Sequence, residues 1–231
     1  MIAVKSGKRD NQEDRHMFAS NLFRKVEADY ISLKIIYLQE PVYLLSTILT
    51  KQVELLEKSF KFYLAIHSTK VIGIRDIVDL GHNLEALREK CETYDVIFKS
   101  NTLKDITKCL NDKSGKFYQH LRYGSFRDIK GWTADIESIM KTIDEIYFYI
   151  IQNFDPLWVQ VFTTHSLLKS IATQSKVTWK NKGLLRKAIS NKNPHFKKYQ
   201  LYCRKLDREI KILNQNIKDK FPCPLTVPSL K

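Results

Sequence analysis

Glycine, proline and cysteine are all scarce in this chain. The 231 residues include 7 Gly, 6 Pro and 4 Cys, and no proline occurs between Pro41 and Pro156. A long stretch with no proline and little glycine is typical of helices, because both residues interrupt them. No alternation of apolar and polar residues reaches the length of a strand. We therefore predict an all-α fold, a helical bundle with a basic helical C-terminal extension.

Long apolar runs are also missing. None approaches the roughly 18–20 residues of a membrane span, and the N-terminus turns polar at once, unlike a secretory signal. The cysteines at positions 91, 109, 203 and 223 form no closely spaced ligand pair, which argues against a metal site. We expect structural thiols, no metal or cofactor, no membrane partner and a cytoplasmic location.

The positive charge is concentrated in one part of the chain. Residues 161–231 hold 16 Lys+Arg against 3 Asp+Glu, whereas the first 160 residues hold 23 against 22. Such an excess favours an anionic partner, which could be nucleic acid, a membrane surface or an acidic protein. A solvated, lysine-rich helix face would produce the same composition. Lysine outnumbers arginine there, which favours attraction to phosphates over reading of bases.

Periodicity and punctuation divide the chain into three parts. We predict a polar, disordered N-terminus over residues 1–13, a helical bundle over 14–155 and the basic extension over 156–231. The predicted helices cover residues 14–40, 42–68, 82–91, 103–110, 132–153, 158–172 and 194–221. Residues 73–80 are predicted as a link, and 176–183 as a basic loop.

The last predicted helix has two kinds of face. An apolar stripe repeats in steps of four and three residues at positions 199, 203, 206, 210, 213 and 217. This stripe could pack against its own domain or against a partner helix. The other faces carry a basic patch of Lys197, Lys198, Arg204, Lys205, Arg208 and Lys211.

Four short motifs in the first 155 residues occur in a familiar order. They are Phe23 to Asp29, Gln52-Val-Glu54-Leu-Leu-Glu57-Lys58, Gly81-His82-Asn83-Leu84 followed by Leu87, and the pair Arg122-Tyr123 before a long helix. This order resembles the HEPN domain family, over about residues 14–155. The resemblance implies a helical bundle associated with a nucleotide or RNA, and a homodimer. It implies ligand contacts for Arg122, Tyr123, His82 and Lys58.

The same residues also have purely structural interpretations. Asn83 can cap a helix, with His82 buried as a turn residue. Glu54 and Lys58 are spaced for an ion pair on a helix surface. Arg122 and Tyr123 could hold a phosphate and stack on a base, or Arg122 could pair with a carboxylate such as Glu54.

Catalysis is the open question. Nuclease members of the family carry Arg, four to six residues and then His at the start of the last core helix, but residues 122–132 contain no His. The primary hypothesis is therefore a non-catalytic binding module. One alternative is a metal-free, toxin-type endoribonuclease paired with a nucleotidyltransferase antitoxin. In it, His82 or His120 would move the proton, and Arg75 or Arg122 would contact the phosphate.

A further alternative is a protein–protein interaction module that uses the apolar stripe of the last helix. Other catalytic signatures are missing from the sequence, including the phosphate-binding glycine loops and His-Glu-x-x-His. The consecutive carboxylates Asp144 and Glu145 are interpreted as ordinary surface residues.

Overall fold

A computed structural model describes residues 12–39, 45–67, 72–111, 136–153, 166–173, 182–190 and 193–220. Every regular element in these ranges is a helix, which confirms the all-α prediction. The elements are α1 (Gln12–Gln39), α2 (Leu45–His67), α3 (Ile74–Asp79), α4 (Leu84–Glu92), the 3₁₀ helix η1 (Val96–Lys99), α5 (Asn101–Leu110), α7 (Ile136–Gln152), α9 (Leu167–Thr173), α10 (Lys182–Ser190) and α11 (Pro194–Lys220).

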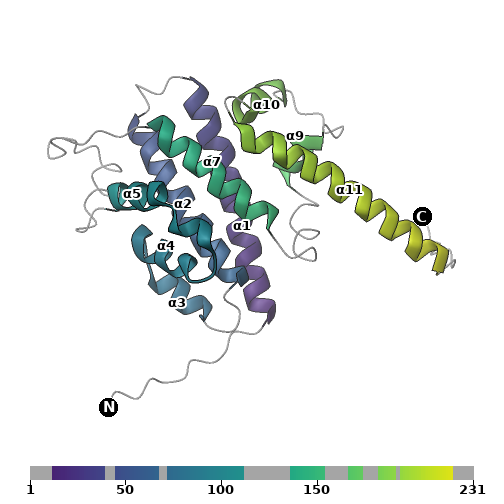
Figure 1. Cartoon of the computed structure of the whole chain (residues 1–231), viewed down its shortest axis with the longest axis horizontal. Coiled ribbons are helices and arrows are strands. Elements are labelled where there is room, and N and C mark those ends of the chain that lie inside the picture. Colours follow the sequence, from purple (N-terminus) through teal and green to yellow (C-terminus); the bar gives the residue numbers. More distant parts are fainter. Residues whose placement is uncertain are drawn as a thin grey trace, which may run out of the picture.

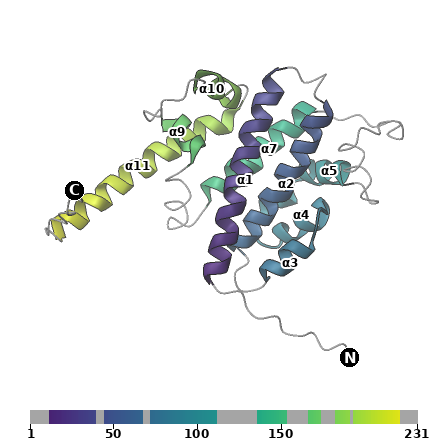
Figure 2. The same ribbon diagram turned by 180° about the vertical axis from the view of Figure 1, so that it is seen from behind.

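The long helices α1, α2 and α7 form the centre of the bundle (Figure 1). The short elements α3, α4 and α5 cover the outer side of α2, and α9, α10 and α11 gather on the opposite side, against α1 and α7. The far half of α11 extends away from the bundle, as both Figure 1 and Figure 2 show. Of the described residues of the extension, α9, α10 and the first half of α11 thus lie against the bundle.

Aromatic side chains join the extension to the bundle core. Tyr30 of α1 stacks on Tyr147 of α7, with ring centroids 4.0 Å apart. Phe148 of α7 lies against Phe196 and Tyr199 of α11, at centroid distances of 6.2 and 5.3 Å. All five rings are buried. Their burial supplies much of the hydrophobic driving force at this junction, because each buries a large apolar area.

Two boundaries in the N-terminal half differ from the sequence prediction. Helix α1 begins at Gln12, inside the segment predicted to be disordered, and Glu13 and Asp14 in its first turn suit the positive end of the helix dipole. The predicted link over residues 73–80 contains helix α3. There the Asp76 carboxylate accepts a hydrogen bond from the Gly73 N–H at 2.9 Å, and Ile77 is buried.

Two more boundaries differ in the extension. The helix predicted over 158–172 is described only from residue 166, and Ser166 caps α9, its Oγ accepting from the Lys169 N–H at 3.0 Å. Helix α10 begins at Lys182, inside the predicted basic loop, and buries Leu185, Ala188 and Ile189. This i, i+3, i+4 spacing places three apolar side chains on one face, which α1 covers.

A buried polar chain links α1, α7 and α11. The Lys34 ammonium pairs with Asp144 Oδ2 at 2.9 Å, and the Tyr30 hydroxyl donates to Asp144 Oδ1 at 2.7 Å. The same hydroxyl accepts from Asn193 Nδ2 at 2.9 Å, and Asn193 Oδ1 accepts from the Phe196 N–H at 3.1 Å, which caps α11. The surface interpretation of Asp144 is wrong: it is 3% exposed, whereas Glu145 is exposed.

Burial raises the pKa of Asp144, and the Lys34 ammonium and the Tyr30 hydroxyl partly oppose that rise. A buried carboxylate is tolerated only when its oxygens are paired, and here both are. The first turn of α11 is therefore held by buried polar groups. Removing one of them would leave its neighbour buried without a hydrogen bond, which lowers the stability of the fold.

We predict that Tyr30→Phe destabilises the protein by about 1–3 kcal/mol, because it leaves Asp144 Oδ1 and the Asn193 amide without their shared partner. Urea unfolding followed by circular dichroism measures the change. Tyr94→Phe is the matched control, since Tyr94 is half-buried against the core. An equal effect of both substitutions would contradict the role of the polar chain.

Candidate nucleic-acid interface

Six basic residues of α11 share one side of the helix. Steps of seven residues lead from Lys197 to Arg204 and Lys211, and Arg208 lies one turn from each of the last two, so these four side chains form a row. Lys198 and Lys205 lie next to this row. We call these six residues the basic face, and all six are exposed. The row from Lys197 to Lys211 is about 21 Å long at the usual helical rise of about 1.5 Å per residue.

Few acidic groups neutralise this face. Lys205 pairs with Glu209 on the same helix, at 3.7 Å. Among the described residues, no carboxylate pairs with Lys197, Lys198, Arg204, Arg208 or Lys211. Five neighbouring cations without a paired carboxylate create a positive potential that attracts polyanions.

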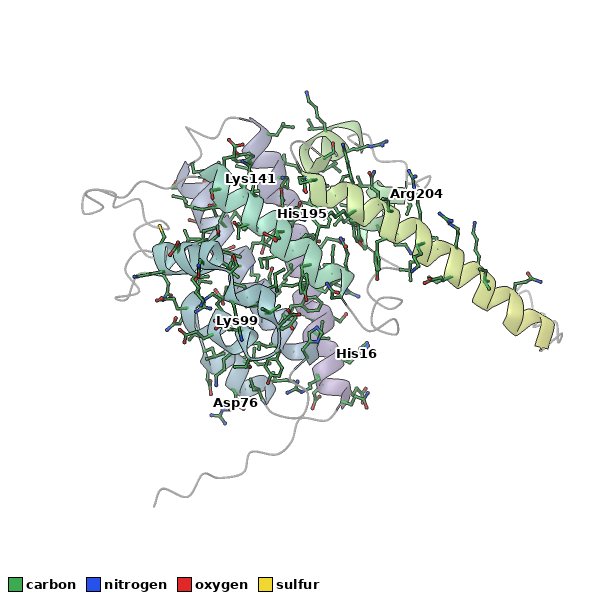
Figure 3. All side chains as sticks on the ribbon, viewed as in Figure 1. His16, Asp76, Lys99, Lys141, His195 and Arg204 are labelled. Atoms are coloured by element: carbon green, nitrogen blue, oxygen red, sulfur yellow. The ribbon has the colours of Figure 1, made fainter. Side chains whose placement is uncertain are left out.

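The opposite side of α11 packs on the bundle. Tyr199 and Cys203 are buried, and Leu206 and Ile210 are half-buried, so the predicted apolar stripe docks on its own chain over this length. From His195 beside the bundle, α11 runs past Arg204 and away from the other helices (Figure 3). The side chains of Leu213 and Ile217, later in the stripe, lie outside the described residues.

Helix α9 packs against α11 and is itself held in place by a buried carboxylate. Glu27 of α1 accepts hydrogen bonds from the N–H groups of Leu167 and Leu168, at 3.1 and 3.2 Å, and from the Ser166 hydroxyl. Lys169 of α9 then pairs with Asp207 of α11 at 2.9 Å. Burial raises the pKa of Glu27, although its three hydrogen bonds oppose the rise.

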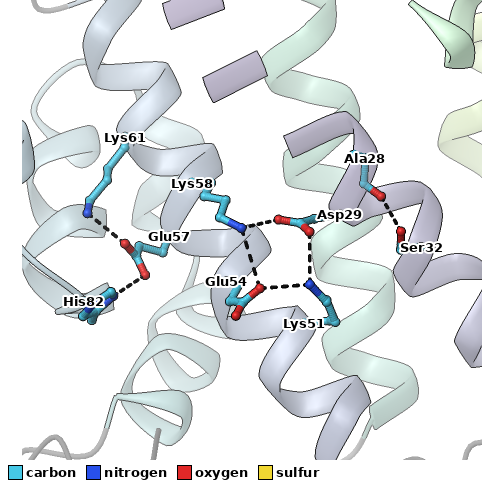
Figure 4. A network of polar contacts seen from close by, with 9 residues as sticks. All are labelled: Ala28, Asp29, Ser32, Lys51, Glu54, Glu57, Lys58, Lys61 and His82. Carbon is cyan, nitrogen blue, oxygen red and sulfur yellow. Dashed lines mark hydrogen bonds and ion pairs between the residues drawn. The ribbon is translucent and has the colours of Figure 1, made fainter. Parts of the chain in front are cut away.

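A second polar group lies between α1 and α2. Lys58 pairs with Asp29 and, at 3.6 Å, with Glu54; Lys51 pairs with the same two carboxylates, at 3.2 and 3.1 Å (Figure 4). The predicted ion pair between Glu54 and Lys58 is confirmed. Because both ammonium groups lie between two carboxylates, Lys58 is a weak candidate for binding a phosphate.

His82 lies at the edge of this surface, in the turn before α4. Gly81 adopts φ 58°, a left-handed conformation that suits glycine, and Asn83 caps α4 by accepting from the Ala86 N–H at 3.0 Å. The helix-capping prediction is thus confirmed. The expectation of a buried His82 is wrong, because its side chain is 68% exposed, with Nδ1 2.7 Å from Glu57 Oε2. Glu57 also accepts from Lys61 at 2.8 Å.

The remaining predicted ligand residues fall in different places. Arg75 is 92% exposed on α3, where it faces Asp79 at 3.9 Å. Arg75 and His82 therefore have separate acidic partners. Arg122, Tyr123 and His120 lie outside the described residues, so their proximity to His82 stays a prediction.

Three residues of these polar groups were not predicted as site residues. Lys51 and Lys61 were missed although both have a carboxylate one turn away, at Glu54 and Glu57. That spacing is enough to predict both ion pairs from the sequence. Glu27 carried no signal, because its partners are more than 130 residues later in the chain.

The comparisons with known proteins yield no match, whether with models of protein families, with curated proteins or with solved structures. Within the described ranges, no three His, Cys, Asp or Glu side chains gather in a way that could hold a metal ion. None of the described helices combines the length and the apolar character needed to cross a bilayer. Any functional assignment therefore depends on the surfaces described above.

We predict that Glu27→Gln has a pH-dependent effect on stability. Because the pKa of Glu27 is raised in the folded protein, the folded state binds more protons than the unfolded state between the ordinary and the raised pKa. Stability of the native sequence then increases as pH falls through this window, and glutamine cannot follow. The free energy of unfolding of the native protein minus that of Glu27→Gln should therefore increase as the pH is lowered from neutral toward the ordinary pKa of a glutamate.

Urea titrations at several pH values measure this difference in the free energy of unfolding. Glu145→Gln, on the exposed side of α7, is the control. A signed difference that stays constant, or that decreases as the pH falls, would contradict the assigned environment of Glu27.

Proposed function

We propose that this protein is a HEPN-like helical module that binds RNA without cleaving it, and that the basic face of α11 is its contact surface. The observation that carries the proposal is the row of exposed cations on the side of α11 turned away from its docked, apolar side. Phosphate contacts supply most of the affinity in sequence-independent binding, and lysine and arginine are the side chains that make them.

Two features support a nucleic acid over a random charged surface. The basic face is anchored, because α11 is held by buried aromatic rings and by the polar chain that ends at Asn193. Its charge is also not neutralised by ion pairs, since five of its six cations pair with no described carboxylate. The choice of RNA comes from the resemblance of residues 14–155 to HEPN domains.

We expect Lys197→Gln/Arg204→Gln/Lys211→Gln to weaken RNA binding and to flatten its salt dependence. On a single strand each phosphate contact contributes about 0.7 to the slope of log K against log salt, so the slope should fall by about 2. Fluorescence anisotropy with a labelled 20-nucleotide RNA over a salt series measures both.

The matched control is Lys90→Gln/Lys99→Gln/Lys108→Gln, which removes the same charge from exposed positions on the opposite side of the bundle. The control should retain most of the affinity and the slope. Equal losses in the two triple variants would show that net charge alone is responsible and would end the assignment to α11.

A second candidate function rests on the contact between His82 and Glu57. A carboxylate that accepts a hydrogen bond from Nδ1 fixes the tautomer of a neutral imidazole, with Nε2 as the basic nitrogen. Such a ring can take the proton of a ribose 2′-hydroxyl without any metal. Against this role, Arg75, one of the two arginines that the nuclease hypothesis places on the phosphate, faces Asp79.

The two functions predict different results for His82→Ala. We expect RNA binding to be unchanged and the native protein to leave RNA intact in EDTA, as judged by gel electrophoresis of an end-labelled transcript. Cleavage by the native protein that disappears in His82→Ala would establish the nuclease instead. His16→Ala, on α1, is the control for effects of histidine removal in general.

The resemblance also implies a homodimer and, for toxin-type members, a nucleotidyltransferase partner. No contact among the described residues bears on either association.

A further inference from the structure

We infer that the basic face of α11 takes double-stranded RNA, along its phosphate rows, in preference to single strands or to DNA. This inference rests on the proposed function and narrows its substrate class. It follows from what the basic face lacks, from where the acidic residues of α11 lie, and from the shape of a single straight helix.

The basic face has no platform for stacking bases. Proteins that hold single strands combine cations with exposed aromatic rings, and each stacked base adds to the affinity. In the described parts of α10 and α11, Phe196 and Tyr199 are buried, and Tyr202 is half-buried with its ring stacked on Tyr199 at 6.2 Å. Among these described residues, the basic face therefore offers a splayed single strand cations and the aliphatic Leu201, with no exposed aromatic ring.

The charge pattern of α11 is one-sided. Asp207 and Glu209 lie between the basic face and the apolar stripe, on the two flanks of the helix. The B-DNA major groove is about 12 Å wide and encloses a helix on both flanks. A helix in that groove would bring Asp207 and Glu209 close to the phosphates, and the like charges would repel. The A-form minor groove is wide and shallow, so only one side of a helix faces the backbone.

The remaining geometry also suits a rigid duplex. A row of cations about 21 Å long on a straight helix has a fixed spacing. The phosphates of a duplex also have a fixed spacing, so neither partner needs to become ordered on binding. Each contact on a duplex releases about 0.9 counterions, against about 0.7 on a single strand. For six contacts and equal affinity at 1 M salt, this difference in slope makes the duplex bind roughly tenfold more tightly near 0.1 M salt.

An anionic membrane surface is a poorer fit for the same face. Leu201 and Ile212, which are 64% and 61% exposed, are the large apolar side chains exposed on described α11. They lie eleven residues apart, and a membrane-surface helix needs a continuous apolar face to insert below the headgroups. The apolar stripe that could serve is docked on α7 and α9 in its first half.

The test compares one 20-mer sequence as single-stranded RNA, as duplex RNA and as duplex DNA, by anisotropy at about 0.1 M salt. We expect duplex RNA to bind roughly tenfold more tightly than the single strand, and more tightly than duplex DNA. A second duplex RNA of unrelated sequence should bind equally well, because phosphate contacts carry no sequence information.

A gain-of-function variant keeps the test independent of folding defects. Leu201→Lys adds a cation to the basic face at an exposed position, and it should strengthen duplex RNA binding and steepen the salt slope by about 0.9. Met17→Lys, at an equally exposed position on α1, is the matched control and should leave the slope unchanged.

The outcomes separate the two proposals. Equal or tighter binding of single-stranded RNA or of duplex DNA, with the slope still reduced in the triple variant of α11, would overturn the duplex inference and leave RNA binding by α11 intact. No binding of any nucleic acid would overturn both. Binding to vesicles that contain phosphatidylserine, with no binding to nucleic acid, would also overturn both and would assign the face to membranes.

Discussion

The structure depends on one buried carboxylate. Asp144 of α7 is 3% exposed, and its oxygens are satisfied by Lys34 and Tyr30 of α1. Tyr30 in turn holds Asn193, which caps α11. A charge in such a place is tolerated only with all its partners in position, so it fixes how three helices meet. Helix α11 therefore leaves the bundle in a direction set by the bundle core.

Helix α11 serves two purposes with opposite sides. The side with Tyr199 and Cys203 completes the hydrophobic core, while the side with Arg204 and Arg208 stays in solvent. Because the docked side fixes the rotation of the helix about its axis, the cations cannot turn toward the bundle. The proposed RNA contact surface is thus a consequence of core packing, and no separate binding domain is needed.

Periodicity predicted most of the helices, since stripes such as Ile139, Ile143 and Tyr147 mark a buried face without reference to the rest of the chain. The exposed basic residues of α11 followed for the same reason. Sequence reasoning failed where the deciding partner was distant. Asp144 was interpreted as a surface residue because its partners Tyr30 and Lys34 are over 100 residues away. Helix α3 was missed for another reason: its six residues are too few for a periodic apolar stripe, and only Ile77 among them is buried.

The separation of charge along the chain has a dynamic consequence. Nearly all of the net charge of +14 belongs to residues 161–231, and α11 carries part of it away from a bundle that is close to neutral. Helix α11 therefore carries a cluster of positive charge outward from the bundle. In the field of a polyanion the molecule would rotate before contact, so that most collisions begin at this cluster and productive encounters become more frequent at low ionic strength.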